Sequence, residues 1–277
     1  MRRPEVKELA ALFPTNDFEF GMSLGKGDLP AFFSPASQRP ELIAERAHWL
    51  SETPELYLGY EPGADDVTAE FVENGIANGF LPANLANLLP RDAFRWIAVN
   101  LDAETMLLKA DAFGSHKLVA GAVCFPSSWS LAEKMGHPLA AIHDPVPTVN
   151  SRFGARIDTF LSRMKPGTAW ERSNWGLSRS PDLNQHPNRK LPRLDATVGM
   201  HEVFLRLEQQ ILAPLPRTRG TVFGLQLFVY PLRELAEVAE IRNGLAHALK
   251  TMPPEIAAYK GIANARERII TLLEQLR

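Results

Sequence analysis

The sequence predicts an α+β fold in which an antiparallel sheet is flanked by helices. In the middle of the chain, several segments alternate apolar and polar residues with period two, which is typical of half-buried strands. Short turns join the expected strands, which favours antiparallel pairing, and the apolar spacing before and after them is helical. We expect a single domain over 1–277, with an N-terminal wrap (1–93), a core (about 94–231) and C-terminal helices (232–277).

The elements of the first part follow from periodicity and from residues that favour helix starts. Residues 1–35 are rich in Gly, Pro and Phe, which indicates an irregular wrap packed by aromatic rings. A helix is expected over 39–51, with Pro40 in its first turn, and a second one begins at Asp65, whose carboxylate can cap it. From Phe94 the pattern has period two and predicts a strand whose inward residues are Ile97, Val99 and Leu101.

Alternation and turn residues define the rest of the chain. Residues 111–115 form a suitable hairpin loop, Ser127 or Ser128 can cap a short helix, and Gly136 can end it. The remaining expected strands are 106–110, 117–125, 169–177, 201–208 and 221–230. The remaining expected helices are 129–135, 153–164, 232–250 and 255–276.

Composition excludes several classes of function. The chain has 30 basic and 32 acidic residues without long blocks of like charge, so we expect no nucleic-acid or membrane partner. The single cysteine, Cys124, cannot support a disulfide framework or a cysteine-held iron–sulfur cluster, and its strand-like context predicts a buried inert thiol. No glycine-rich nucleotide loop follows a strand. Without an apolar signal core or a long apolar run, we expect a cytoplasmic protein.

Several motifs together resemble one known family. The motifs are Phe125-Pro126-Ser127-Ser128-Trp129, Glu133-Lys134-Met135-Gly136, Ile142-His143-Asp144-Pro145-Val146-Pro147, Arg172-Ser173-Asn174-Trp175, Leu215-Pro216-Arg217-Thr218 and Tyr259-Lys260-Gly261. This set resembles the α subunit of the haem-dependent oxidative N-demethylases over roughly residues 20–265.

The resemblance implies a PAS-like antiparallel sheet that holds haem b against flanking helices. It implies an oxygen-dependent reaction on a small N-methylated amine, with electrons from a separate flavin and iron–sulfur reductase. The formaldehyde released can pass to tetrahydrofolate. Two other readings stay open: a haem enzyme with a different reaction, and a non-catalytic PAS-like haem or ligand sensor.

The resemblance also implies site residues. His143 is the expected axial ligand of the haem iron, although a histidine bonded within a Pro-rich turn is an equal alternative. His137 and His201 are weaker candidates. Arg172 can pair with a haem propionate or lie in solvent, and on a strand Asn174 shares its face while Trp175 points to the other. The other implied residues are Trp129 and Lys134 toward the cofactor, each with a core or solvent alternative, and the catalytic candidates Glu208, Trp175 and Glu104.

Three polar positions depart from the family pattern. An acid of the family is replaced at Ala103, and arginines are replaced at Gln209 and Gln226. An arginine-to-glutamine change removes a fixed charge and a planar set of donors. These departures imply a different substrate, a loss of catalysis or a compensated structural exchange.

Overall fold

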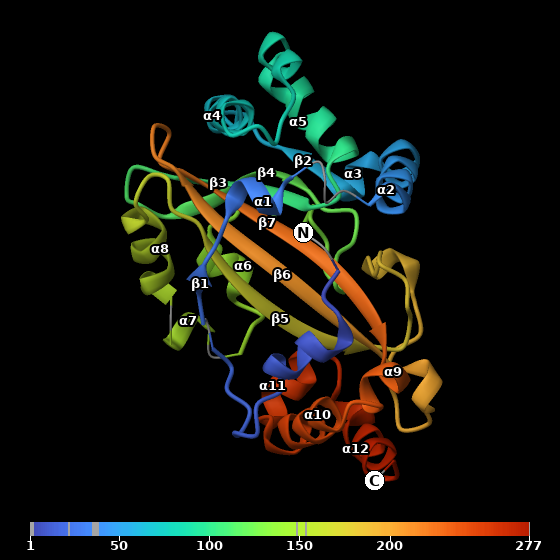
Figure 1. Ribbon diagram of the computed structural model, residues 1–277. Coiled ribbons are helices and arrows are strands. Elements are labelled where there is room, and N and C mark those ends of the chain that lie inside the picture. The colour runs from blue at the N-terminus through green and yellow to red at the C-terminus, as the bar shows by residue number, and fades with distance from the viewer. Residues whose placement is uncertain (1–2, 22, 35–38, 148, 153, 277) are drawn as a thin grey trace.

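In the computed structural model, the structure describes residues 3–21, 23–34, 39–147, 149–152 and 154–276. A seven-stranded antiparallel sheet, in the order β1-β5-β6-β7-β3-β4-β2, runs through the middle of the molecule (Figure 1). Together with the helices around it, this sheet confirms the predicted α+β fold. The strands are β1 (Gly25–Lys26), β2 (Leu58–Tyr60), β3 (Glu104–Ala110), β4 (His116–Ala122), β5 (Trp170–Ser178), β6 (Phe204–Leu215) and β7 (Gly220–Pro231).

Helices lie at both ends of the sheet and against both of its faces. α2, α4 and α5 gather at one end in Figure 1, and α10 to α12 gather at the other. The helices are α1 (Leu29–Phe32), α2 (Pro40–Glu52), α3 (Pro54–Tyr57), α4 (Asp65–Ala77), α5 (Pro90–Asn100), α6 (Leu139–His143), α7 (Val149–Arg152), α8 (Gly154–Arg163), α9 (Leu232–Ala236), α10 (Ala239–Thr251), α11 (Pro254–Tyr259) and α12 (Arg266–Glu274).

The two faces of the sheet are covered differently, as alternation along β6 shows. Leu205, Leu207 and Ile211 are fully buried on one side, which we call the packed face and which also carries Gln209. The N-terminal segment and helices α4, α5, α10 and α12 fill this side with two apolar clusters.

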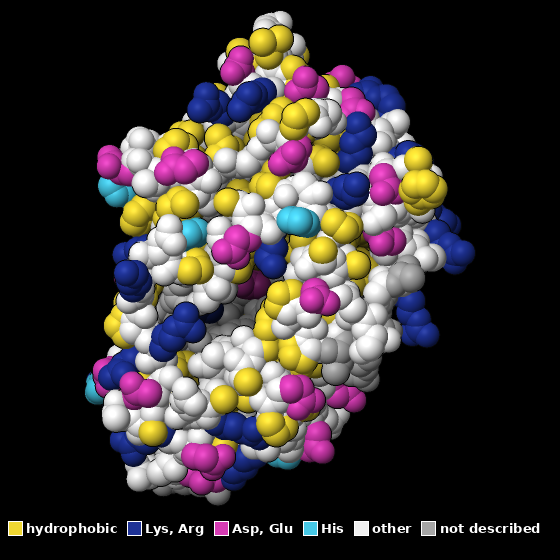
Figure 2. Space-filling view, turned by 180° about the vertical axis from the view of Figure 1, so that it is seen from behind, with side chains coloured by type: hydrophobic (Ala, Val, Ile, Leu, Met, Phe, Trp, Pro, Cys, Tyr) yellow, Lys and Arg dark blue, Asp and Glu magenta, His cyan; other side chains and the backbone are white. Residues whose placement is uncertain are grey.

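On the opposite side, even-numbered residues of β6 point toward α6, α8 and the loops 123–135 and 180–194. This side, which we call the hollowed face, carries Glu208 and Gln210 of β6. A third apolar cluster covers the part of it nearest β3 and β4, where Ile157 and Leu161 of α8 and Leu139 of α6 meet Leu225 and Leu227 of β7. Figure 2 shows this side of the molecule with a hollow near its middle.

One predicted strand is wrong. The segment from Phe94 is helix α5, and it begins four residues earlier at Pro90. Its buried residues, Ala93, Phe94, Ile97 and Ala98, have helical spacing, so the apparent alternation of Ile97 with Leu101 was accidental. Pro90 occupies the first helical position, where proline is favoured, and this signal for a helix start is stronger than the apparent alternation.

Other predictions hold only in part. Residues 129–135 form turns rather than a helix, and Asp65 lies inside α4, where it accepts a hydrogen bond from Tyr60 instead of capping. The strand expected from His201 begins at Phe204. Both expected C-terminal helices are interrupted, the second at Gly261, whose φ is +68°. The predicted helix 153–164 is α8, although Phe153 lies outside the described residues.

Among the described residues, no helix combines the length and apolar character needed to span a membrane.

Candidate functional site

A row of polar side chains lies across the two central strands on the hollowed face. In the register of β5 and β6, Arg172 is paired with Gln210 and Asn174 with Glu208. Residues directly opposite each other in an antiparallel pair project to the same side, so these four side chains share the hollowed face. The predicted common face of Arg172 and Asn174 is therefore confirmed.

His143 is the last residue of α6, at the rim of this face. Its Nδ1 atom is buried and has no hydrogen-bond partner. Burial lowers the pKa of the imidazole, and the nearby cations Arg172 and Lys134 lower it further. The ring is therefore biased toward the neutral form, which is the form that coordinates a metal.

Arg172 and Lys134 are the basic groups nearest His143. The Nε atom of Arg172 is buried without a partner, and burial lowers the pKa of its guanidinium. Lys134 is half-buried, and its ammonium donates weakly to the carbonyl of Ile142, the residue before His143 (3.4 Å). An incoming anionic group would therefore find two cations beside the imidazole, one with an unsatisfied donor.

Glu208 is the centre of the hydrogen-bond network on this face. Its carboxylate accepts from Ser127 Oγ (2.8 Å), Asn174 Nδ2 (3.1 Å) and Gln210 Nε2 (3.0 Å). All three donors are neutral, so they fix the orientation of the carboxylate without an ion pair. Three hydrogen bonds leave lone-pair capacity for one further donor.

Ser127 is itself held by Arg206, the next residue on the same side of β6. The Arg206 guanidinium donates to Ser127 Oγ at 3.3 and 3.4 Å and to the carbonyls of Asp182 and Leu183. Burial lowers the pKa of Arg206 to about 10. These contacts tie the loops that flank the hollow to the sheet and place Ser127 on Glu208.

Lys260, at the end of α11, extends the network past the edge of β5. Its ammonium donates to the carbonyl of Trp175 (2.6 Å) and to Asn174 Oδ1 (3.3 Å). Burial lowers its pKa to about 8. No site role was predicted for Lys260, Ser127, Gln210 or Arg206. Two matched motifs contain Lys260 and Ser127 and could have pointed to them, namely Tyr259-Lys260-Gly261 and Phe125-Pro126-Ser127-Ser128-Trp129. Gln210 and Arg206 lie in neither motif.

The side chains of two predicted catalytic residues take no part in the hydrogen bonds of Glu208, although the backbone carbonyl of Trp175 accepts from Lys260. Trp175 is on the packed face, where its ring meets that of Phe13 edge-on (5.2 Å between centroids). Glu104 is 1 % exposed, forms an ion pair with Arg46 (2.9 Å) and accepts from two backbone amides. With both oxygens occupied, its geometry fits a structural role. Trp129 is half-buried against the third apolar cluster, and the exposed His137 and His201 lie at the surface.

The three departures from the family pattern also lie away from the hollow. Gln209 and Gln226 are paired with each other across β6 and β7, and both belong to the packed face. Gln226 donates to the carbonyl of Phe32 and to Asp102, next to the buried Ala103. The altered positions therefore form one group on the side of the sheet opposite Glu208.

Apolar side chains lie on the hollowed face beside the polar row. Half-buried apolar side chains border the third cluster here, namely Trp129, Ile142, Val146, Phe160, Trp170, Leu212 and Phe223. Among the described residues, no group of three or more His, Cys, Asp and Glu could hold a bare metal ion. A haem iron needs only an axial side chain from the protein, and an unpaired buried imidazole nitrogen fits that need.

The chain was compared with models of known protein families. The model described as haem-dependent oxidative N-demethylase, alpha subunit-like, matches residues 64–270, which is well over half of the chain. The match includes His143, Arg172, Glu208 and Lys260. This chain therefore belongs to the family of proteins similar to the α subunit of haem-dependent oxidative N-demethylase.

Proposed function

We propose that the protein binds haem b in the hollow, with His143 as the axial ligand, and oxidatively demethylates a small N-methylated amine. One observation carries the haem part. His143 presents a partly buried imidazole with an unpaired nitrogen, biased toward neutrality by burial and by two neighbouring cations. Such a group is costly to keep unless a ligand uses it.

A few side chains would hold the cofactor, some by charge and others by apolar contact. Arg172 and Lys134 lie close enough to His143 to lower its pKa, and both can pair with the haem propionates. The apolar border formed by residues such as Phe160 and Trp170 would cover the porphyrin and exclude water. When bound, haem supplies the iron that activates oxygen.

Glu208 is the group best placed to act on an amine. Its carboxylate is oriented by Ser127, Asn174 and Gln210 and has room for one more donor. The negative charge of Glu208 would attract a methylated ammonium group. The same carboxylate could then accept the proton that the amine gives up.

The electrons are proposed to come from a separate reductase, as the α subunit-like description of the family suggests. The only cysteine is buried, and burial raises the pKa of its thiol to about 12, so Cys124 is inert. Tetrahydrofolate as the acceptor of formaldehyde stays a prediction of the resemblance.

The axial role is tested by visible spectroscopy on the full chain expressed with added haem. The expected result is a Soret band that responds to dithionite and carbon monoxide. In His143→Gly the band should weaken and shift, and added imidazole should restore it because the free ligand fills the vacated position. His137→Ala and His201→Ala, which remove exposed histidines, are the controls and should leave the spectrum unchanged.

Catalysis is tested separately, by formaldehyde release with a surrogate reductase. A colourless wild-type protein would contradict haem binding. A Soret band that keeps its wild-type position and height in His143→Gly without imidazole would remove His143 from the axial position. A coloured protein that releases no formaldehyde from any N-methylated amine tested would leave haem binding intact and contradict the demethylase activity.

A further inference from the structure

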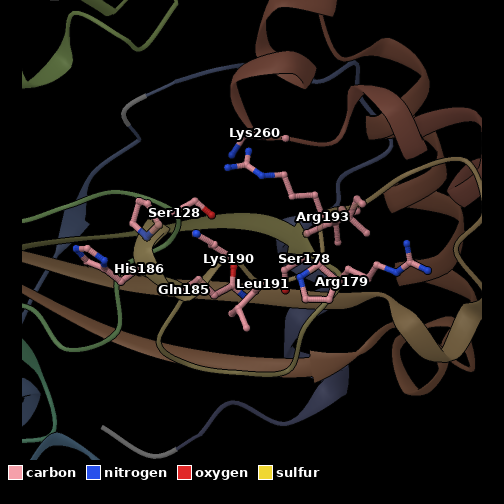
Figure 3. A pocket seen from close by; sticks show the side chains of 14 residues that line it. Ser128, Ser178, Arg179, Gln185, His186, Lys190, Leu191, Arg193 and Lys260 are labelled. Carbon is pink, nitrogen blue, oxygen red and sulfur yellow. The ribbon is translucent and has the colours of Figure 1, made fainter. Parts of the chain in front are cut away.

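A second pocket opens beyond Lys260, at the end of β5. Its walls come from the end of β5, from the loop 185–194, from Ser128 and from the turn after α11. Figure 3 shows Lys190 and Arg193 of the loop 185–194 and Lys260 of the turn after α11 directed into this pocket, whereas the guanidinium of Arg179 points away. We call it the cationic pocket, defined by Lys190, Arg193 and Lys260.

The charges around the cationic pocket are unbalanced. No Asp or Glu is among its lining residues. Arg179, which also lines it, is neutralised by ion pairs with Asp195 (2.6 Å) and Glu202 (2.8 Å). Within the described part of the chain, the side chains of Lys190 and Arg193 have no ion pair or hydrogen bond. Two free cations and a buried ammonium therefore face one space, which favours an anion.

The backbone of the pocket is strained at two of its lining residues. Ser128 has φ +64° and Lys190 has φ +50°, and neither is glycine. Left-handed conformations of this kind cost about 1 kcal/mol or more and concentrate at functional sites. Here they turn the chain so that the Lys190 side chain and Ser128 border the same space.

Lys260 connects the cationic pocket to the network of Glu208. Its ammonium donates to Asn174 Oδ1, and Asn174 Nδ2 in turn donates to Glu208. An oriented carboxylate and a cluster of cations thus lie at the two ends of one short hydrogen-bonded chain. A molecule with an ammonium at one end and a carboxylate at the other matches both.

We propose that the cationic pocket binds the carboxylate of the substrate, so that the substrate class is an N-methylated amino acid rather than a simple alkylamine. The binding of the amine group near Glu208 rests on the proposed function. The binding of an anion in the cationic pocket rests only on the residues that line the pocket.

The position of the pocket separates it from the expected haem propionates. Ser178 lines the pocket, whereas Arg172 lies beside His143, six positions earlier on the same strand. At roughly 3.4 Å per residue this spacing is about 20 Å. Arg172 and Lys134 supply cations at the haem end, so Lys190 and Arg193 remain for another anion.

The test is calorimetric titration of the full chain, with and without haem, using N,N-dimethylglycine, dimethylamine and acetate as probes. The wild-type protein should bind N,N-dimethylglycine at least about tenfold more tightly than dimethylamine. Lys190→Gln and Arg193→Gln should each weaken N,N-dimethylglycine binding about threefold to tenfold and leave dimethylamine binding unchanged. The exposed cations Lys165 and Arg233 are controls of equal charge, and Lys165→Gln and Arg233→Gln should change nothing.

The other possible results distinguish a wrong carboxylate assignment from a wrong proposed function. Equal affinity for the two amines, or affinities that are insensitive to Lys190→Gln and Arg193→Gln, would overturn the carboxylate assignment. Loss of the Soret band in these variants would indicate that the pocket binds haem propionates, and this result would also overturn the carboxylate assignment. Carboxylate-selective binding by a protein that takes up no haem would support the pocket and contradict only the proposed function.

Discussion

At the scale of the residue, the partners of a side chain distinguish two carboxylates that the sequence could not separate. Glu208 and Glu104 were both predicted to be catalytic. Glu104 is saturated by a buried arginine and two backbone amides, and burial raises its pKa although Arg46 opposes the rise. Glu208 has only neutral donors and lies on the hollowed face. A single sequence does not contain this difference, because it depends on which side chains the fold brings near.

A substitution at Glu208 tests its role directly. Glu208→Gln keeps the size and most hydrogen bonds but removes the charge, so formaldehyde release should fall by at least about 100-fold. The Soret band should stay unchanged because the axial imidazole is untouched. The exposed Glu267 provides the control, and Glu267→Gln should have full activity. Wild-type turnover in Glu208→Gln would exclude Glu208 from the reaction.

Lys260 gives a pH dependence. Burial is the main reason that its pKa falls to about 8, with Glu208 opposing the shift and Arg172 adding to it. Its ammonium is therefore charged below about pH 8 and loses the charge above it, so affinity for a carboxylate ligand should fall as pH rises through about 8. In Lys260→Met this step should vanish and affinity should be low throughout. Titrations of N,N-dimethylglycine between pH 6.5 and 9.5 would show it, and a flat wild-type profile would contradict it.

At the scale of the element, period-two alternation, together with turn residues, predicted most strands of the sheet. It succeeded for β3, β4, β5 and β7, where tight turns such as 111–115 also set the limits. It failed at α5, because four apolar residues in a short run fit either period. The turns of 129–135 were missed because their shape depends on long-range contacts, such as the amide of Gly136 donating to Leu118.

The ion pair of Arg46 and Glu104 joins α2 to β3 inside the protein. Arg46 is 0 % exposed and also donates to the carbonyl of Ala98 in α5. Removing either partner leaves a buried charge unpaired, so Arg46→Met or Glu104→Gln should lower the free energy of unfolding by about 3–5 kcal/mol. Urea denaturation would measure the loss.

The double variant of this pair should cost less than the sum of the single ones, because no charge is left alone. The exposed pair of Lys250 and Glu274 is a control, and Lys250→Met should cost no more than about 1 kcal/mol. Single-variant losses as small as this in the buried pair would contradict its structural role.

At the scale of the whole molecule, one sheet separates structural and functional positions between its two faces. His143, Lys134, Arg172 and Asn174 were predicted from matched motifs, and Glu208 was predicted separately as a catalytic candidate. The fold brings their side chains toward the hollowed face. Lys260 and Arg206 were missed because their roles depend on contacts between segments that are far apart in the sequence. Lys260 follows α11 and donates to Asn174 of β5, and Arg206 of β6 donates to the loops that flank the hollow. The sequence left open whether the departures at Gln209 and Gln226 are functional or structural, and the fold pairs them on the packed face.

This separation predicts opposite effects for two neighbouring residues of β6. Gln210 points to the hollow and donates to Glu208 (3.0 Å), whereas the Oε1 atom of Gln209 is buried on the packed face without a partner. Gln210→Met should lower catalytic efficiency about fivefold, as expected for one lost hydrogen bond of about 1 kcal/mol. Gln209→Met, of similar shape, should leave activity unchanged and stability equal or higher, because it removes an unsatisfied polar atom. Kinetics and urea denaturation of both variants measure this contrast. If Gln209→Met reduced activity as much as Gln210→Met, the two faces would not be functionally separate, and the departures at Gln209 and Gln226 would have to be counted as changes to the reaction itself.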